Sequence, residues 1–197
     1  MEYIAHRINT VAALKEIPEE YGVELDLRDF GNRIILEHEP FKDGEDFEEY
    51  LKYYHHGTMI LNIKSERIEH RVLELIQRHG IKKYFFLDSS FSMIELLTRS
   101  GEKNLALRLS EYECLETILN FKGKADWVWV DCFTKFPISH KEYQILRDNG
   151  FKLCFVSPEL QSQKEKLVGY KEYMKKEGMV FDAICTKSNN IEQWRLF

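Results

Sequence analysis

The chain has 197 residues, of which 44% are hydrophobic and 31% are charged, a composition that excludes a disordered chain and predicts one globular domain over residues 1–197. Its formal net charge of −5 argues against nucleic acid as a partner. The first 21 residues lack the pattern of a secretory leader, and no apolar run approaches the roughly 20 residues that span a bilayer. We therefore expect a cytoplasmic protein without a transmembrane segment.

Short apolar runs with the composition of β-strands alternate with amphipathic helical patterns along the whole chain, which is typical of parallel βα units. The predicted strands are Tyr3–His6, Val23–Leu27, Met59–Ile63, Tyr84–Asp88, Leu105–Leu109, Trp127–Cys132, Leu153–Ser157 and Ala183–Thr186. The predicted helices are Thr10–Tyr21, Asp46–His55, Glu66–His79, Ser92–Ser100, Glu113–Phe121, Ser139–Asn149, Gln161–Glu177 and Ile191–Leu196. A glycine that could form a left-handed helix end follows five of these helices, at Gly22, Gly80, Gly101, Gly150 and Gly178.

Eight strands in one domain favour an α/β fold of the compact (β/α)8 TIM barrel type, at about 25 residues per unit. The alternative is an open doubly wound sheet, which alternation alone does not exclude. No glycine-rich nucleotide loop follows the first strand. The extra helix makes a small insertion near residues 45–56, which packs on the rim of the barrel, covers its mouth or meets a partner. The oligomeric state stays open.

The cysteines predict buried thiols in a reducing compartment, and neither disulfides nor a zinc site. They are four, at Cys114, Cys132, Cys154 and Cys185, widely spaced and without a Cys-x-x-Cys pair. The last three lie in apolar runs that resemble strands.

Polar side chains stand near the carboxyl end of every predicted strand, the end at which a barrel carries its chemistry. They are His6 and Arg7, Glu24 and Asp26, Asn62 and Lys64, Asp88, Arg108 with Ser110 and Glu111, Asp131, Ser157 with Glu159, and Thr186 with Lys187. We expect a polar site built from several of these residues. For Asp131 the interpretation that we favour is structural hydrogen bonding.

The best-defined group surrounds the second strand. Glu24 and Asp26 are two residues apart, so they project from the same face, roughly 7 Å from each other. Two carboxylates so close need a proton or a cation between them, and hard oxygen ligands suit Mg²⁺ or Ca²⁺. His6 ends the preceding strand, and the turn at residues 29–32 returns the chain so that His38 lies near the same end. These residues predict a site for a phosphate ester, although a structural ion pair of the carboxylates with Arg7 or Lys64 would explain them as well.

The motifs His6-Arg7, Asn9-Thr10, Glu24-Leu25-Asp26 and His38-Glu39-Pro40 resemble, in order and spacing, those of glycerophosphodiester phosphodiesterases and their relatives similar to phosphatidylinositol-specific phospholipase C. The resemblance covers about the first third of the chain. It implies a TIM barrel in which His6 and His38 are the general acid and base. It also implies that Glu24 and Asp26 hold a divalent cation, Mg²⁺ or Ca²⁺.

The sequence departs from the motifs of that family at two positions that bear on the chemistry. Ile8 replaces the glycine that usually follows His-Arg, and Lys64 replaces the carboxylate of the Asn-x-Glu on the third strand. Either the cation is held more weakly, with the help of a group such as Glu66, or Lys64 replaces it.

We therefore expect a phosphoric diester hydrolase that acts on a small-molecule substrate, either a glycerophosphodiester or a phosphosugar, by acid–base catalysis with two histidines. Arg7, Lys64 and Arg108 would bind the phosphate. The alternative is an inactive barrel that binds a phosphorylated sugar or a phospholipid headgroup.

Overall fold

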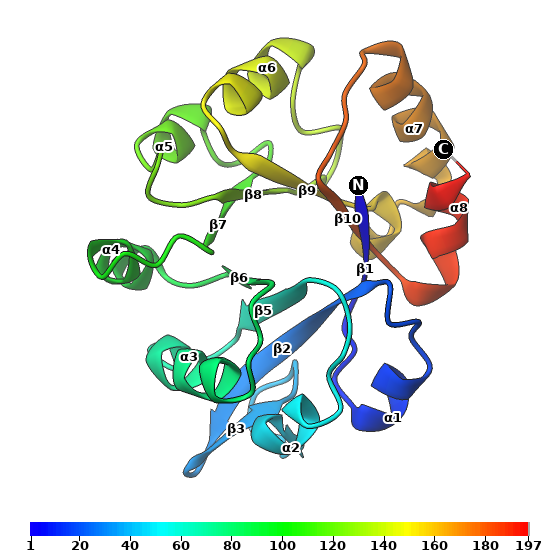
Figure 1. Cartoon of the computed structure of the whole chain (residues 1–197). Coiled ribbons are helices and arrows are strands. Elements are labelled where there is room, and N and C mark those ends of the chain that lie inside the picture. Colours follow the sequence, from blue (N-terminus) through cyan, green and yellow to red (C-terminus); the bar gives the residue numbers. More distant parts are fainter. Residues whose placement is uncertain (197) are drawn as a thin grey trace.

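The structure, a computed structural model, describes residues 1–196 and contains a ring of parallel strands with helices around its outside (Figure 1). The ring consists of β1 (Glu2–Ala5), β2 (Gly22–Phe30), β5 (Met59–Ile63), β6 (Tyr84–Leu87), β7 (Ala106–Leu109), β8 (Trp127–Val130), β9 (Lys152–Val156) and β10 (Ala183–Thr186). Each of the eight predicted strands is present, and the TIM barrel is confirmed.

Most neighbouring strands pair over several residues, but the seam between β6 and β7 is weak. The pairs β1–β2, β2–β5, β5–β6, β7–β8, β8–β9, β9–β10 and β10–β1 are all parallel ladders. Between β6 and β7 there is one isolated bridge, from Phe86 to Leu105, and the Phe86 N–H donates to the carbonyl of Asn104 at 2.8 Å. One side of the barrel is therefore closed by far fewer backbone hydrogen bonds than the rest.

The second strand continues beyond the barrel as a hairpin. The outer part of β2 pairs antiparallel with β3 (Arg33–Leu36), and β3 pairs with β4 (Glu45–Asp46). The chain then enters α2 (Phe47–Leu51), in the range of the predicted insertion. The Tyr50 hydroxyl is buried and donates to the carbonyl of Ile8 at 3.0 Å, so α2 packs on the chain's own barrel.

The other helices are α1 (Val11–Lys15), α3 (Glu69–Arg78), α4 (Phe91–Arg99), α5 (Leu115–Leu119), α6 (His140–Asp148), α7 (Leu167–Lys176) and α8 (Ile191–Arg195), with 3-10 turns η1 (Pro158–Gln161), η2 (Lys164–Lys166) and η3 (Ser188–Asn190). α1 is much shorter than predicted, because Pro18 lacks an N–H and disfavours helical geometry at the residue before it. The predicted helix at 161–177 begins later, because Ser162 adopts a left-handed conformation with φ of 59°.

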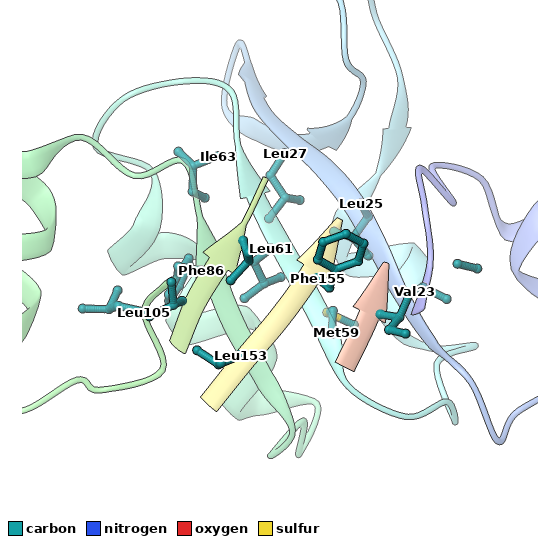
Figure 2. Close-up of a cluster of buried hydrophobic side chains, with 14 of the residues drawn as sticks. Val23, Leu25, Leu27, Met59, Leu61, Ile63, Phe86, Leu105, Leu153 and Phe155 are labelled. Carbon is teal, nitrogen blue, oxygen red and sulfur yellow. The ribbon is translucent and has the colours of Figure 1, made fainter. Parts of the chain in front are cut away.

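Alternation along β2 separates the core from the site. Val23, Leu25 and Leu27 lie in the large hydrophobic cluster between strands and helices (Figure 2). Glu24 and Asp26 must then face the barrel interior. The lower interior is filled by apolar side chains, among which Phe85 stacks on Trp127 with ring centroids 4.5 Å apart. The polar residues of the candidate site lie at the carboxyl end of the interior.

Four of the five glycine predictions are confirmed, because Gly80, Gly101, Gly150 and Gly178 have positive φ immediately after helices. The prediction for Gly22 is wrong. Gly22 lies within β2, and a Cβ there would stand 2.4 Å from the carbonyl oxygen of Thr58, so the requirement at this position is close approach of two strands.

All four cysteines are free, but only three are buried as predicted, and Cys114 is exposed at the start of α5. None of the helices in residues 1–196 combines the length and apolar character needed to cross a membrane.

Candidate active site

The carboxyl ends of six strands bring polar and charged side chains together at the mouth of the barrel. These are His6 and Arg7 after β1, Glu24 and Asp26 on β2, Asn62 and Lys64 at the end of β5, Asp88 after β6, and Arg108 on β7, with Asp131 after β8. They are linked by the contacts described below into one continuous group.

The buried carboxyl of Glu24 is the innermost member of this group. Its Oε2 accepts a hydrogen bond from the backbone N–H of Arg7 at 2.7 Å and lies 3.6 Å from His6 Nε2. Its Oε1 accepts from Asn62 Nδ2 at 2.7 Å. Burial, together with the charge of Asp26, raises the pKa of Glu24 to about 7. Glu24 thus carries a proton for part of the time at neutral pH.

His6 is neutral at the same pH. Burial lowers its pKa to about 4, and the charges of Arg7, Lys64 and His38 act in the same direction against that of Asp26. Because Glu24 is protonated at the pH at which His6 titrates, it offers no negative charge to an imidazolium. Between about pH 4 and pH 7 the contact of His6 with Glu24 therefore joins two uncharged groups, and a neutral imidazole can accept a proton.

Asp26 is clamped by Asn9. The Asn9 Nδ2 donates to Asp26 Oδ2 at 2.8 Å, and the Asp26 N–H donates to Asn9 Oδ1 at 2.9 Å. Arg7 Nε lies 3.5 Å from Oδ2, and Lys64 Nζ lies 3.7 Å from Oδ1. The Asn9-Thr10 motif thus has two roles. Asn9 holds Asp26, and Thr10 caps α1 by accepting a hydrogen bond from the Ala13 N–H at 3.0 Å.

Lys64 and Arg108 are joined by a shared carboxylate. Lys64 Nζ lies 3.3 Å from Asp88 Oδ2, while the Arg108 guanidinium pairs with both Asp88 and Asp131. Gln161 Nε2 holds the other oxygen of Asp131 at 2.9 Å. Asp88 is therefore an anion held between two cations, at a place that remains partly open to solvent.

Two residues of the mouth have backbone conformations that residues other than glycine seldom adopt. Arg7 and Asp88 both have a φ of 58°, at a cost on the order of 1–3 kcal/mol each, and such strain concentrates at functional sites. The conformation of Arg7 directs its N–H to Glu24.

His38 reaches the edge of the site by way of the hairpin. The N–H of the preceding Glu37 donates to the Asp26 carbonyl at 3.1 Å, and His38 Nδ1 contacts Glu39 Oε1 at 2.7 Å. Arg28 fixes this loop, because its Nε and Nη2 donate to the His38 carbonyl at 3.1 and 2.9 Å and its Nη1 donates to the Lys64 carbonyl at 2.9 Å.

The contacts of the two carboxylates fit an ammonium better than a divalent ion. Glu24 and Asp26 already face the N–H groups of Arg7, Asn9 and Asn62. Lys64 occupies the space between Asp26 and Asp88. Among residues 1–196, no three His, Cys, Asp or Glu side chains are grouped so that they could hold a metal ion. The assignment of Glu24 and Asp26 as metal ligands therefore stays a prediction.

The remaining polar residues near strand ends form separate structural networks. Ser157 and Thr186 both donate to Glu159, and Trp194 Nε1 donates to Ser157 Oγ at 2.8 Å. Ser110 pairs with Glu113, and Glu111 accepts from Thr134. The contribution of Arg28 was missed in the sequence, although it lies on the face of β2 that carries Glu24 and Asp26, two residues further on.

No protein-family model and no curated protein sequence matches this chain. Among solved structures, it is similar to a glycerophosphodiester phosphodiesterase from Agrobacterium tumefaciens, with a TM-score of 0.70 and 13% identity over 100% of both chains. It is also similar to a glycerophosphoryl diester phosphodiesterase from Parabacteroides distasonis, with a TM-score of 0.66 and 12% identity over 100% of this chain and 87% of the other. At such low identity the likeness shows the fold. The resemblance in the sequence is thus confirmed at the level of structure, and the chain has the barrel fold of the glycerophosphodiester phosphodiesterases.

Proposed function

We propose that this chain is a phosphoric diester hydrolase acting on a small-molecule substrate such as a glycerophosphodiester or a phosphosugar. The observation that carries the proposal is the position of Asp88, a carboxylate held between Lys64 and Arg108 beside Asp26. A place where two fixed cations share one anion is suited to a phosphate, whose charge they stabilise in the transition state. Arg7 adds a third cation on the other side of Asp26.

Proton transfer is assigned to the two histidines. Neutral His6 takes the proton of the attacking hydroxyl, which belongs either to the substrate or to water, as oxygen bonds to phosphorus. His38, in its protonated form, gives a proton to the leaving alkoxide as the phosphorus–oxygen bond breaks. Attack by a substrate hydroxyl yields a cyclic phosphate and a free alcohol, and a later water molecule opens the ring.

Lys64 takes the place of a divalent ion in this proposal. It is held by Asp26 at 3.7 Å and Asp88 at 3.3 Å and is mostly buried, so its ammonium is positioned before substrate arrives. Its charge is smaller than that of Mg²⁺, but it needs no ligands from the solvent and directly faces a bound phosphate.

The test is hydrolysis of a panel of phosphodiesters, including a chromogenic ester, in EDTA, in Mg²⁺ and in Ca²⁺. We expect activity that survives EDTA and falls by about 10²–10⁴-fold in His6→Ala and in His38→Ala. His70→Ala, an exposed histidine on α3, is the matched control and should retain full activity. Phosphorus NMR identifies a cyclic product.

The outcomes that contradict the proposal are distinct. Activity that requires Mg²⁺ or Ca²⁺ would refute the role of Lys64 and make Glu24 and Asp26 working ligands. Absence of hydrolysis across the panel, with binding of phosphorylated compounds retained, would instead favour an inactive barrel that binds a phosphosugar or a phospholipid headgroup.

A further inference from the structure

A cavity of about 420 Å³ lies beside the weak seam of the barrel, between α4 and α5. Its wall is mainly apolar and includes Leu87 and Ala106 from the interior cluster and Ile94, Leu107 and Ile118 from the outer cluster. The cavity is therefore lined by residues from both faces of the layer of strands, at the seam where β6 and β7 share one bridge.

One end of the same cavity is charged. Asp88 and Arg108 line it, and through Asp88 it adjoins Lys64 and the group around Asp26. The cavity therefore combines an apolar wall with the charged side chains of Asp88, Arg108 and Glu113, and the ammonium of Lys64 lies next to it, across Asp88.

The outer rim adds apolar surface that is exposed to solvent. Phe91 is 57% exposed and Tyr112 is 74% exposed, and both line the cavity. Aromatic side chains that continue into an apolar cavity are a feature of ligand-binding sites. The volume also falls in the range of ligand pockets, and cavities of less than half that volume hold a benzene molecule.

We propose that this cavity binds an alkyl chain carried by the alcohol half of the phosphodiester, with the phosphate at Lys64 and Arg108. The inference rests on the proposed function and narrows its substrate class to esters of an apolar alcohol. A free amphiphilic ester and a single-chain lipid share this chemistry. Each methylene that enters the cavity contributes up to about 0.8 kcal/mol, which is about a fourfold gain in affinity.

Cys114 provides a reporter that needs no substitution. It is the exposed cysteine, it lines the cavity, and its Sγ lies 3.1 Å from Thr117 Oγ1. The experiment measures the rate at which iodoacetamide alkylates Cys114 in the whole chain, in the presence of methyl, butyl or octyl phosphate, or of 1-octanol. We expect protection that increases in the order methyl, butyl, octyl phosphate, with octanol protecting only at higher concentration.

Matched variants test the location. Thr117→Phe fills the cavity from α5 and should abolish the dependence on chain length. Thr98→Phe makes the same change on α4, at a half-buried position outside the cavity lining, and should preserve it. Should Thr117→Phe fail to fold, the protection measured on the unmodified chain still decides.

The outcomes separate this inference from the proposed function. Equal protection by methyl and octyl phosphate would overturn the inference and leave hydrolysis, measured on the panel above, unaffected. Protection by octanol equal to that by octyl phosphate would keep the alkyl site but remove the phosphate from Lys64 and Arg108, against both proposals. If the ester that bears the alkyl chain is hydrolysed in solution but not in vesicles, the substrate is a free amphiphile. If it is hydrolysed equally in both, the substrate is a lipid. Either result supports the alkyl site.

Discussion

Replacing Lys64 by glutamate should raise the affinity of the barrel mouth for Mg²⁺ and Ca²⁺ by about a thousandfold. Lys64 Nζ stands 3.7 Å from Asp26 Oδ1 and 3.3 Å from Asp88 Oδ2. A cation held by Asp26 together with Glu24, the two predicted ligands, would lie roughly 4 Å from the ammonium. Unit charges at that separation interact by about 1 kcal/mol even at the dielectric constant of water, so a divalent ion is repelled by about 2 kcal/mol.

Reversing the sign of the charge doubles this effect to about 4 kcal/mol. The value is a lower bound, because Asp26 is buried and Lys64 is only 18% exposed, and a lower effective dielectric constant strengthens every term. Lys64→Met removes the repulsion without adding attraction, so it should give about half of the free energy, or about a thirtyfold gain.

Isothermal titration calorimetry with each cation measures the affinity. Lys152→Glu makes the same charge change at the first residue of β9, at the opposite end of the barrel, and should leave affinity near that of the unmodified chain. Thermal unfolding verifies that each variant folds. Unchanged affinity in Lys64→Glu, or an equal gain in Lys152→Glu, would refute the reasoning that the charge of Lys64 repels a divalent cation from this site.

Three further changes test other parts of the site. The folded-state pKa of Glu24 is raised from 4.5 to about 7, so its contribution to stability is complete below pH 4.5 and is lost as the pH rises through 7. The free energy of unfolding should therefore fall by about 3 kcal/mol at most between pH 4.5 and pH 8. Glu24→Gln should abolish this fall, which urea unfolding at the two pH values measures. Asp88→Asn leaves two cations without their shared carboxylate and should tighten inorganic phosphate binding about tenfold in calorimetry, whereas no gain would remove the anion site. Arg28→Met loses three hydrogen bonds to backbone carbonyls and should lower the rate of hydrolysis at least about tenfold. Arg33→Met, which removes an exposed ion pair on the same hairpin, should leave the rate unchanged. Equal rates in the two variants would show that the loop of His38 needs no support from Arg28.

The sequence predicted all eight strands because each is a short apolar run between helical patterns, a signal that depends on neighbours along the chain. The helices were harder to bound where local chemistry intervenes, as at Pro18, which ends α1 early. The weak seam at Phe86 and Leu105 could not be foreseen, because both flanking strands read as ordinary apolar strands. Strand pairing depends on how the ring closes, and that depends on the stagger of all its members.

The site was predictable as a set of residues but not as a set of contacts. Alternation places Glu24 and Asp26 on one face, and the same alternation reaches Arg28. Its role could not be predicted, because it depends on the carbonyls of His38 and Lys64, which alternation along β2 does not locate. The sequence also left Lys64 as either a structural ion pair or a cation for the phosphate. The structure shows an ammonium shared by Asp26 and Asp88, which relieves the repulsion between two carboxylates. In the proposed function the same ammonium also meets the phosphate, so one arrangement would serve both purposes. A lysine that served only to neutralise Asp26 would need no second partner. In the proposed function that second partner, Asp88, with its strained left-handed conformation, is the group that the phosphate displaces.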